Sequence, residues 1–158
     1  MGRWTKRLIA CAAVFLAAVP AWALSPFIVF FDPGSARLTP AAEAILDNAV
    51  ATMRVLDIRS IEITGSADRA GSDAGNLVLS RRRAEAVRDA LLAKGMSRHM
   101  RVHIIAAGET QPLVETADGV ADAQNRYVTV IMTGGCFDWT SRDNRRSTEG
   151  ECATPLPG

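Results

Sequence analysis

The stretch GSADRAGSDAGNLVLSRRRA, residues 65–84, divides into two parts of different character. Residues 65–75 are polar and contain glycines, which predicts a loop. From Asn76 to Lys94 the sequence predicts a helix, and Gly95 is suited to end it in a left-handed conformation. Small and apolar side chains are expected to share one face of this helix, namely those of Ser80, Ala84, Val87 and Leu91.

The segments before this stretch predict a strand, a helix and a second strand. Residues 27–31 are apolar and rich in side chains that favour strands. Thr39 is expected to cap a helix that has Pro40 in its first turn and that runs to about Leu56. Residues 60–64 alternate between apolar and polar side chains, as expected of a half-buried strand.

The segments after the stretch predict two more strands. Residues 101–107 and 126–132 alternate in polarity, and residues 108–124 between them predict a loop that holds at most a short helical turn. The resulting order β-α-β-α-β-β predicts an α+β fold, in which two helices pack on one small mixed sheet. We expect the domain to span residues 24–133 and a polar tail to follow at 134–158.

Residues 1–23 are typical of a secretory signal peptide. Three basic residues precede a continuous apolar run at 8–19, and the small-x-small sequence at 21–23 is a cleavage site. Twelve helical residues span about 18 Å, which is less than the roughly 30 Å of a bilayer's hydrocarbon core. The sequence therefore predicts export and cleavage after Ala23, with no membrane-spanning segment left in the mature chain.

Two alternatives to this cleavage remain open, an uncleaved membrane anchor and lipidation of Cys11 within a sequence that resembles a lipobox. Cleavage after Ala23 would leave 15 Lys and Arg against 17 Asp and Glu, a net charge of −2.

Cleavage after Ala23 would also remove Cys11 and leave Cys136 and Cys152. An even pair in an exported protein predicts a disulfide, with two free thiols as the alternative. The bond would close a loop of about 15 residues and stabilise the fold by about 3 kcal/mol in the chain-entropy model.

Composition and motifs argue against several classes of function. With 18 Lys and Arg against 17 Asp and Glu, no basic excess indicates a nucleic-acid partner. His99 and His103 are four residues apart, but the segment changes from turn to strand between them, so they are not expected to hold a metal ion. No histidine forms a recognisable triad with a serine and an acid. We therefore expect neither an enzyme nor a cofactor.

Several motifs resemble the peptidoglycan-binding domain of the OmpA-like family. That family shows Gly-x-x-Asp at the end of a strand, then a Gly-Ser turn, an Asn, and Leu-Ser-x-x-Arg-Ala on the next helix. The corresponding residues here are Gly65, Asp68, Gly71, Ser72, Asn76, Leu79, Ser80, Arg83 and Ala84. Further similar motifs lie at residues 30–39, at 108–112 and at 125–128, so the resemblance covers about residues 27–132.

The resemblance implies a ligand and the residues that bind it. In this family the ligand is the diaminopimelate of the peptidoglycan stem peptide, which carries an ammonium and a carboxylate close together. Asp68 would accept the ammonium, and Arg83 would bind the carboxylate through its planar guanidinium. Asp32, Asn76 and Arg126 match positions near the family's pocket.

Helical geometry is compatible with this assignment. At about 100° per residue, Arg83 lies roughly 70° from the centre of the apolar face, and is thus expected at its rim. Arg82 points into solvent, whereas Arg81 lies at the other rim, so that the family motif rather than geometry selects Arg83. Backbone N–H groups of the turn at 71–72 and of the helix N-terminus are further candidate donors to a carboxylate.

These features together predict an exported protein of the periplasm that binds peptidoglycan non-covalently, and association with the outer membrane is left open as an alternative location. A protein of the cell envelope is a further candidate partner, through the tail at 134–158. The alternative is an interaction or structural module of the envelope that keeps the fold and has lost peptidoglycan binding. Ser66, Ala67 and Tyr127 favour this alternative, because they depart from residues that the family often has at these positions.

Overall fold

The computed structural model describes residues 26–56 and 58–133. The predicted signal peptide at 1–23 and the candidate lipidation site Cys11 lie outside these residues. The tail with Cys136 and Cys152 lies outside them as well, so the export signal and the disulfide remain predictions.

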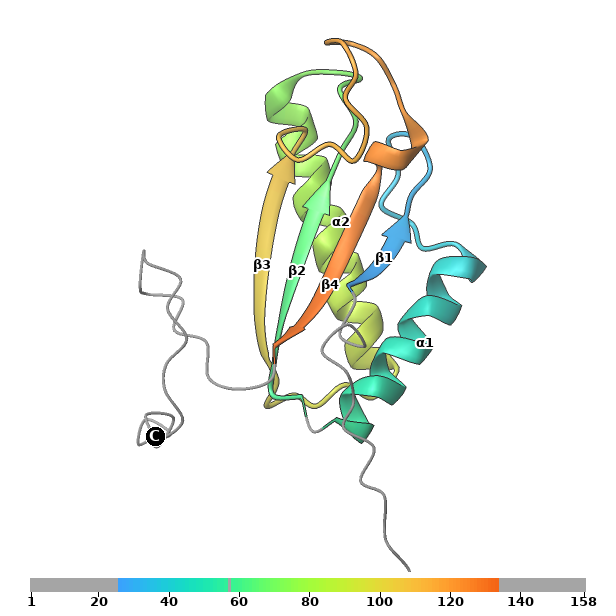
Figure 1. The fold of residues 1–158 in the computed structure, drawn as a ribbon, viewed down its shortest axis with the longest axis vertical. Coiled ribbons are helices and arrows are strands. Elements are labelled where there is room, and N and C mark those ends of the chain that lie inside the picture. Colours follow the sequence, from blue (N-terminus) through green and yellow to red (C-terminus); the bar gives the residue numbers. More distant parts are fainter. Residues whose placement is uncertain (1–25, 57, 134–158) are drawn as a thin grey trace, which may run out of the picture.

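Four strands form one mixed sheet in the order β1-β4-β2-β3 (Figure 1). Their bounds are Phe27–Phe30 for β1, Ser60–Ser66 for β2, Arg101–Gly108 for β3 and Tyr127–Thr133 for β4. Strand β4 pairs antiparallel with both β1 and β2, and β2 pairs in parallel with β3. The last strand of the chain therefore lies in the interior of the sheet, between the first strand and the second.

Both helices pack on the same face of this sheet, as the predicted α+β fold requires (Figure 1). Helix α1 spans Pro40–Val55, and the hydroxyl of Thr39 accepts a hydrogen bond from the N–H of Ala42 at 3.2 Å, which confirms the predicted cap. Helix α2 spans Asp73–Ala93 and is followed by Gly95 with a positive φ of 98°, which confirms the predicted end.

The predicted start of α2 was wrong by three residues. The helix begins at Asp73 rather than Asn76, because the hydroxyl of Ser72 caps it by accepting a hydrogen bond from the N–H of Gly75 at 3.2 Å. The sequence predicts that Gly75 belongs to the loop, but it lies in the first turn of the helix. Strand β2 is also longer than predicted and continues to Ser66.

The apolar core lies between the sheet and the two helices. It combines the inward side chains of three strands with one stripe from each helix, including Val29, Leu46, Val50, Ile61, Ile63, Val87, Leu91, Val128 and Val130. Helix α2 approaches β2 closely at Gly65, where a methyl group would collide with the backbone carbonyl of Ser80. This close contact fixes the end of β2 against the middle of α2.

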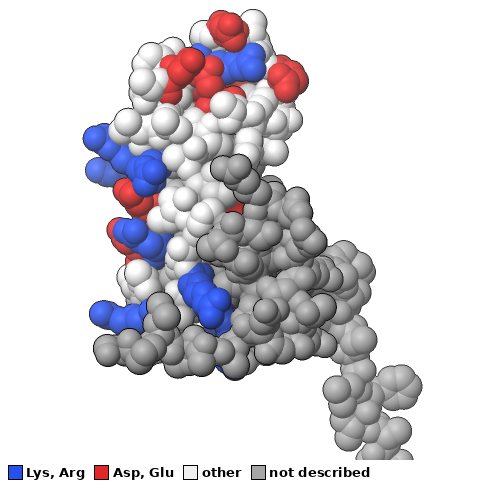
Figure 2. Space-filling view, turned by 90° about the vertical axis from the view of Figure 1, so that its left-hand side faces the viewer, with Lys and Arg blue, Asp and Glu red and all other residues white. Residues whose placement is uncertain are grey.

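Charged side chains of both signs are distributed over the described surface. Figure 2 shows basic and acidic groups interspersed along one flank, with acidic groups gathered near a basic one at the loop end of the domain. No broad area of a single sign is visible among the described residues on this face, which agrees with the near-neutral composition.

Candidate functional site

The candidate site lies at one end of the sheet, where three strands end and the fourth begins. Strands β1, β2 and β3 run in the same direction, and β4 runs against them, so the C-terminal ends of the first three meet the start of β4. The loop after β1, the loop after β2 and the short 3₁₀ helix Ala123–Asn125 before β4 therefore come together here (Figure 1).

Arg83 is completely buried at this end of the sheet. Its guanidinium donates three hydrogen bonds to backbone carbonyls, from Nε to Ser35 at 2.8 Å, from Nη1 to Ser66 at 2.9 Å and from Nη2 to Asp32 at 3.1 Å. The guanidinium carbon also lies 5.3 Å from the centre of the Phe31 ring, within range of a cation–π contact. Helical geometry predicted a rim position for Arg83, and this was wrong because the loop after β1 closes over the side chain.

Burial lowers the pKa of Arg83 from its ordinary value of 12.5 to about 10. The charge of Asp68 opposes this shift and raises the pKa, whereas the charge of Arg126 lowers it further. The guanidinium nevertheless remains protonated at neutral pH. The site therefore holds a desolvated positive charge that is satisfied by main-chain carbonyls.

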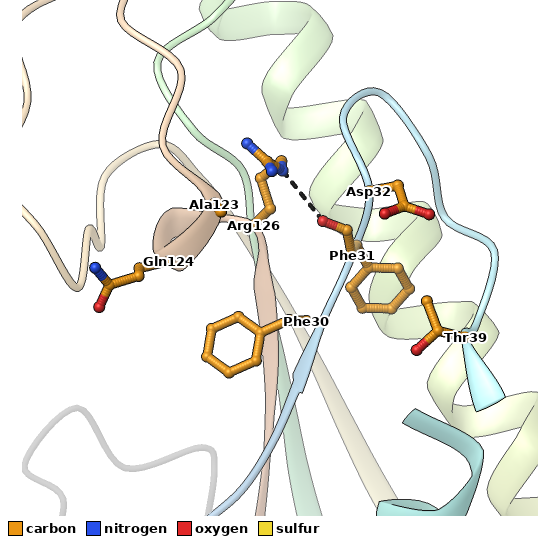
Figure 3. Close-up of a pocket in the computed structure, with 7 residues that line it drawn as sticks. All are labelled: Phe30, Phe31, Asp32, Thr39, Ala123, Gln124 and Arg126. Carbon is orange, nitrogen blue, oxygen red and sulfur yellow. Dashed lines mark hydrogen bonds between the residues drawn. The ribbon is translucent and has the colours of Figure 1, made fainter. Parts of the chain in front are cut away.

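Asp68 makes its direct ion pair with Arg126. The distance from Asp68 Oδ2 to Arg126 Nη1 is 3.0 Å, and the two side chains are only 8% and 12% exposed. Arg126 is held in place by a second hydrogen bond, from Nε to the carbonyl of Phe31 at 3.1 Å (Figure 3). Asp68 thus acts on Arg83 through its charge while it bonds to Arg126.

The side chains of Asp68, Arg83 and Arg126 form what we call the three-charge cluster. It contains two guanidinium groups and one carboxylate, so its net charge is +1. Charges with so little access to water interact strongly, because the surrounding protein screens them less than water does. The cluster is therefore suited to attract a negatively charged group.

A pocket of about 410 Å³ opens beside this cluster. Figure 3 shows the residues that line it, which are Phe30, Phe31, Asp32, Thr39, Ala123, Gln124 and Arg126. Arg126 and the exposed residue Asp32 both line this pocket. Four of the five predicted binding residues, Asp32, Asp68, Arg83 and Arg126, are thus joined in one site by contacts or by a shared pocket wall.

Asn76 is the predicted residue that the structure does not bring to this pocket. It is buried, and its side-chain amide donates a hydrogen bond to Glu109 Oε2 at 2.6 Å. Glu109 and the first turn of α2 line a second hollow of about 340 Å³ together with Asp73. The helix N-terminus, proposed above as a donor site for a carboxylate, therefore faces this second hollow and carries an acidic side chain of its own.

Sequence reasoning missed the residues that hold the loop between β3 and β4. The amide of Asn125 accepts a hydrogen bond from the N–H of Val114 at 2.9 Å and donates one to its carbonyl at 2.7 Å. The hydroxyl of Tyr127 donates to the carbonyl of Gln111 at 2.8 Å. The motif around Asn125 was visible in the sequence, but nothing local indicates that its amide pairs with a loop residue.

Comparison with known proteins identifies the family. Residues 30–126 match the description "OmpA family", and this range contains all five predicted binding residues.

The chain belongs to the OmpA family.

The regions aligned with similar proteins cover most of the described residues. The "Outer membrane protein A" of Bordetella avium is 30% identical over 105 residues, which cover 66% of this chain and 54% of that protein. The "Peptidoglycan-associated lipoprotein" of Rhizobium meliloti (strain 1021) is 32% identical over 106 residues, which cover 67% of this chain and 60% of that protein. The matches thus span between about half and three fifths of these two relatives.

Solved structures of the OmpA-like fold superpose on this chain. The crystal structure of the peptidoglycan-associated lipoprotein from Burkholderia pseudomallei gives a TM-score of 0.61 at 29% identity, covering 67% of this chain and 89% of that one. The C-terminal domain of MotB from Helicobacter pylori gives a TM-score of 0.59 at 17% identity, which is a likeness of fold alone. These comparisons confirm the expected fold.

Two further properties of residues 26–56 and 58–133 concern membranes and metals. Neither helix in these ranges is sufficiently long and apolar to cross a bilayer. Over the same residues, no three His, Cys, Asp or Glu side chains lie together in a way that would hold a metal ion.

Proposed function

We propose that this chain binds peptidoglycan non-covalently through the diaminopimelate of the stem peptide. The observation that carries the proposal is the three-charge cluster, in which a net charge of +1 lies beside a pocket that Asp32 also lines. Diaminopimelate offers a carboxylate and an ammonium close together, so one ligand can satisfy both kinds of group. The name of the Rhizobium meliloti relative, a peptidoglycan-associated lipoprotein, supports this ligand class.

The proposed contacts follow from the donors and acceptors that the site has left. Arg83 uses three of the five N–H groups of a guanidinium on carbonyls, which leaves two N–H groups as candidate donors to a ligand carboxylate. Asp68 would accept the ligand ammonium, with Asp32 at the mouth of the pocket as a second acceptor. Asn76 would act indirectly, by holding Glu109 and the loop around it.

The setting of this activity is the cell envelope. The signal peptide at 1–23 would direct the chain to the periplasm, where peptidoglycan is accessible, and relatives are named as outer membrane proteins. The proposed role is binding without catalysis. A protein partner, engaged through the tail at 134–158, would position the bound domain relative to the outer membrane.

One observation favours the alternative function, an interaction module that does not bind peptidoglycan. Asp68 already has a cationic partner in Arg126, and Arg83 is buried beneath three carbonyls. If these bonds serve the fold alone, the cluster is a structural element.

A pulldown with insoluble peptidoglycan tests the proposal against this alternative. We expect the wild-type chain to sediment with peptidoglycan, and Asp68→Asn to reduce the bound fraction about tenfold, because the ammonium loses its charged partner. The matched control is Asp118→Asn, which removes an exposed ion pair with Arg69 and should sediment like the wild type. Thermal unfolding of each variant verifies that it is folded.

The same assay can reject the proposal in two ways. A wild-type chain that stays in the supernatant supports the interaction module. A folded Asp68→Asn variant that sediments as well as the wild type would show that binding, if present, does not use this site.

A further inference from the structure

The ion pair between Asp68 and Arg126 occupies one oxygen, Oδ2, of the carboxylate that a ligand ammonium would need. Arg126 Nη1 lies 3.0 Å from Asp68 Oδ2, and both side chains are nearly excluded from water. An ammonium that takes the position of Arg126 Nη1 at Asp68 Oδ2 must therefore displace that guanidinium. The new partner of the displaced guanidinium then affects which ligands the site binds.

The two arginines of the cluster differ in how firmly they are held. Arg83 is bound to two carbonyls of the loop after β1 and to one at the end of β2, and it has no exposed surface. Arg126 lines the open pocket, and its side chain is held by the carbonyl of Phe31 and by Asp68. Among the described residues, Nη2 of Arg126 has no hydrogen-bond partner. Arg126 is thus the group that can turn toward the pocket while Arg83 stays.

The net charge of the three-charge cluster limits which ligands can replace Arg126 at Asp68. The cluster alone carries +1. An ammonium without a carboxylate would raise the total to +2 and bring three positive groups around one carboxylate, which is unfavourable at low exposure. A ligand with both groups leaves the total at +1, because its carboxylate can pair with the guanidinium that its ammonium displaces.

On the basis of the proposed function, we propose that Arg126 is the exchangeable partner of Asp68 and determines selectivity for ligands that carry an ammonium and a carboxylate together. In the free protein Arg126 neutralises Asp68. In the complex the ligand ammonium takes that position, and Arg126 donates hydrogen bonds to the ligand carboxylate across the pocket. Arg83 stays bonded to its three carbonyls and keeps its two remaining N–H groups for the same ligand carboxylate.

Calorimetric titration with three small ligands tests the exchange. The probes are meso-diaminopimelate, 1,5-diaminopentane, which keeps the ammonium groups alone, and heptanedioate, which keeps the carboxylates alone. For the wild type we expect diaminopimelate to bind at least about tenfold more tightly than either of the others, as one charged hydrogen bond would give.

The informative variant is Arg126→Gln. We expect it to bind diaminopimelate about tenfold more weakly and diaminopentane about tenfold more tightly, since Asp68 is released and one positive charge is removed. The preference for diaminopimelate over diaminopentane should therefore fall by about a hundredfold. Arg126→Lys keeps the charge and should keep most of the preference, and Arg101→Gln, an exposed arginine on β3, should match the wild type.

The outcomes separate this inference from the proposed function. Binding of diaminopimelate by the wild type with an unchanged preference in Arg126→Gln would overturn the exchange and leave the proposed function intact. Failure of the wild type to bind either diaminopimelate or peptidoglycan would overturn both. If Arg126→Gln does not fold, nitrogen-15 NMR of the wild type gives the answer. The Nε–H signal of Arg126 should then shift on titration with diaminopimelate more than that of Arg83, and equal shifts would contradict the exchange.

Discussion

Two clusters of charged side chains connect distant parts of this chain, and they differ in almost every physical respect. In the three-charge cluster, Asp68 lies between Arg126 and the fully buried Arg83. In the second cluster, Lys94 at the end of α2 pairs with Glu43 and Asp47 of α1, both at 2.8 Å. The first has an excess of positive charge and little access to water, whereas the second has an excess of negative charge and partly exposed carboxylates.

The difference shows how burial changes the role of an ion pair. Around Lys94 water remains available to each partner, so breaking the pairs exchanges one solvated state for another. Around Arg83 water is replaced by three carbonyls and by Phe31, so removal of the guanidinium leaves those acceptors without partners. The buried cluster should therefore dominate stability as well as binding, and substitutions in the two clusters can test this.

Replacement of Arg83 should have the largest effect. We expect Arg83→Met to lower the free energy of unfolding by about 3–5 kcal/mol, because it leaves buried polar groups unpaired and an acid without one of its counter-charges. Urea denaturation measures this loss, with the exposed neighbour Arg82→Met as the control that should change stability little. A loss below about 1 kcal/mol for Arg83→Met would indicate that the cluster does not support the fold.

Replacement of Asp68 should have an intermediate effect. We expect Asp68→Asn to lower the free energy of unfolding by about 2 kcal/mol, since two guanidinium groups then face each other without a carboxylate. The double variant Asp68→Asn, Arg126→Gln should recover part of this loss, because it also removes one of the two positive charges. Strictly additive losses in the double-mutant cycle would show that the pair is not energetically coupled.

Replacement of Lys94 should have the smallest effect and a distinctive pH dependence. Hydrogen bonds to Asp47 and then to Glu43 raise the pKa of Lys94 above its ordinary value of 10.5. Its contribution is therefore fully present below pH 10.5 and is lost as the pH rises through the higher folded-state value. The difference in urea midpoint between wild type and Lys94→Met should be small at neutral pH and should shrink further above pH 10.5.

The control for this pH dependence is Arg88→Met, which removes the exposed ion pair between Arg88 and Asp89. The difference in urea midpoint between Arg88→Met and the wild type should not decrease above pH 10.5 in the way expected for Lys94→Met. A Lys94→Met variant whose deficit grows with pH would contradict the sign given above.

Local signals in the sequence predicted the elements of this fold well. Thr39 and Pro40 marked the start of α1, and Gly95 marked the end of α2, because caps and left-handed glycines act over a few residues. The predicted start of α2 was wrong for a related reason. Gly75 is a loop signal by itself, and the hydroxyl of Ser72 outweighs it by capping the helix.

Contacts between distant residues were less predictable. The pairing of Asp68 with Arg126 joins residues 58 positions apart, and no local spacing indicates it. Arg83 was selected through a resemblance to a family, but its burial depends on carbonyls of Ser35 and Asp32 from another loop. Sequence patterns thus predicted residues that the structure brings close together, whereas the tertiary fold determined which of them are bonded to each other.

The position of β4 within the sheet has a consequence for when the site can exist. Strand β1 pairs only with β4 among the described strands, and Phe27 lies opposite Val130. The first strand must therefore wait for the last before it joins the sheet, and such non-local pairing is typical of slow folding. Arg126 arrives with that same last strand. A chain that is still being synthesised would hold Asp68 and Arg83 without Arg126, so the complete cluster forms only when the whole domain has been made.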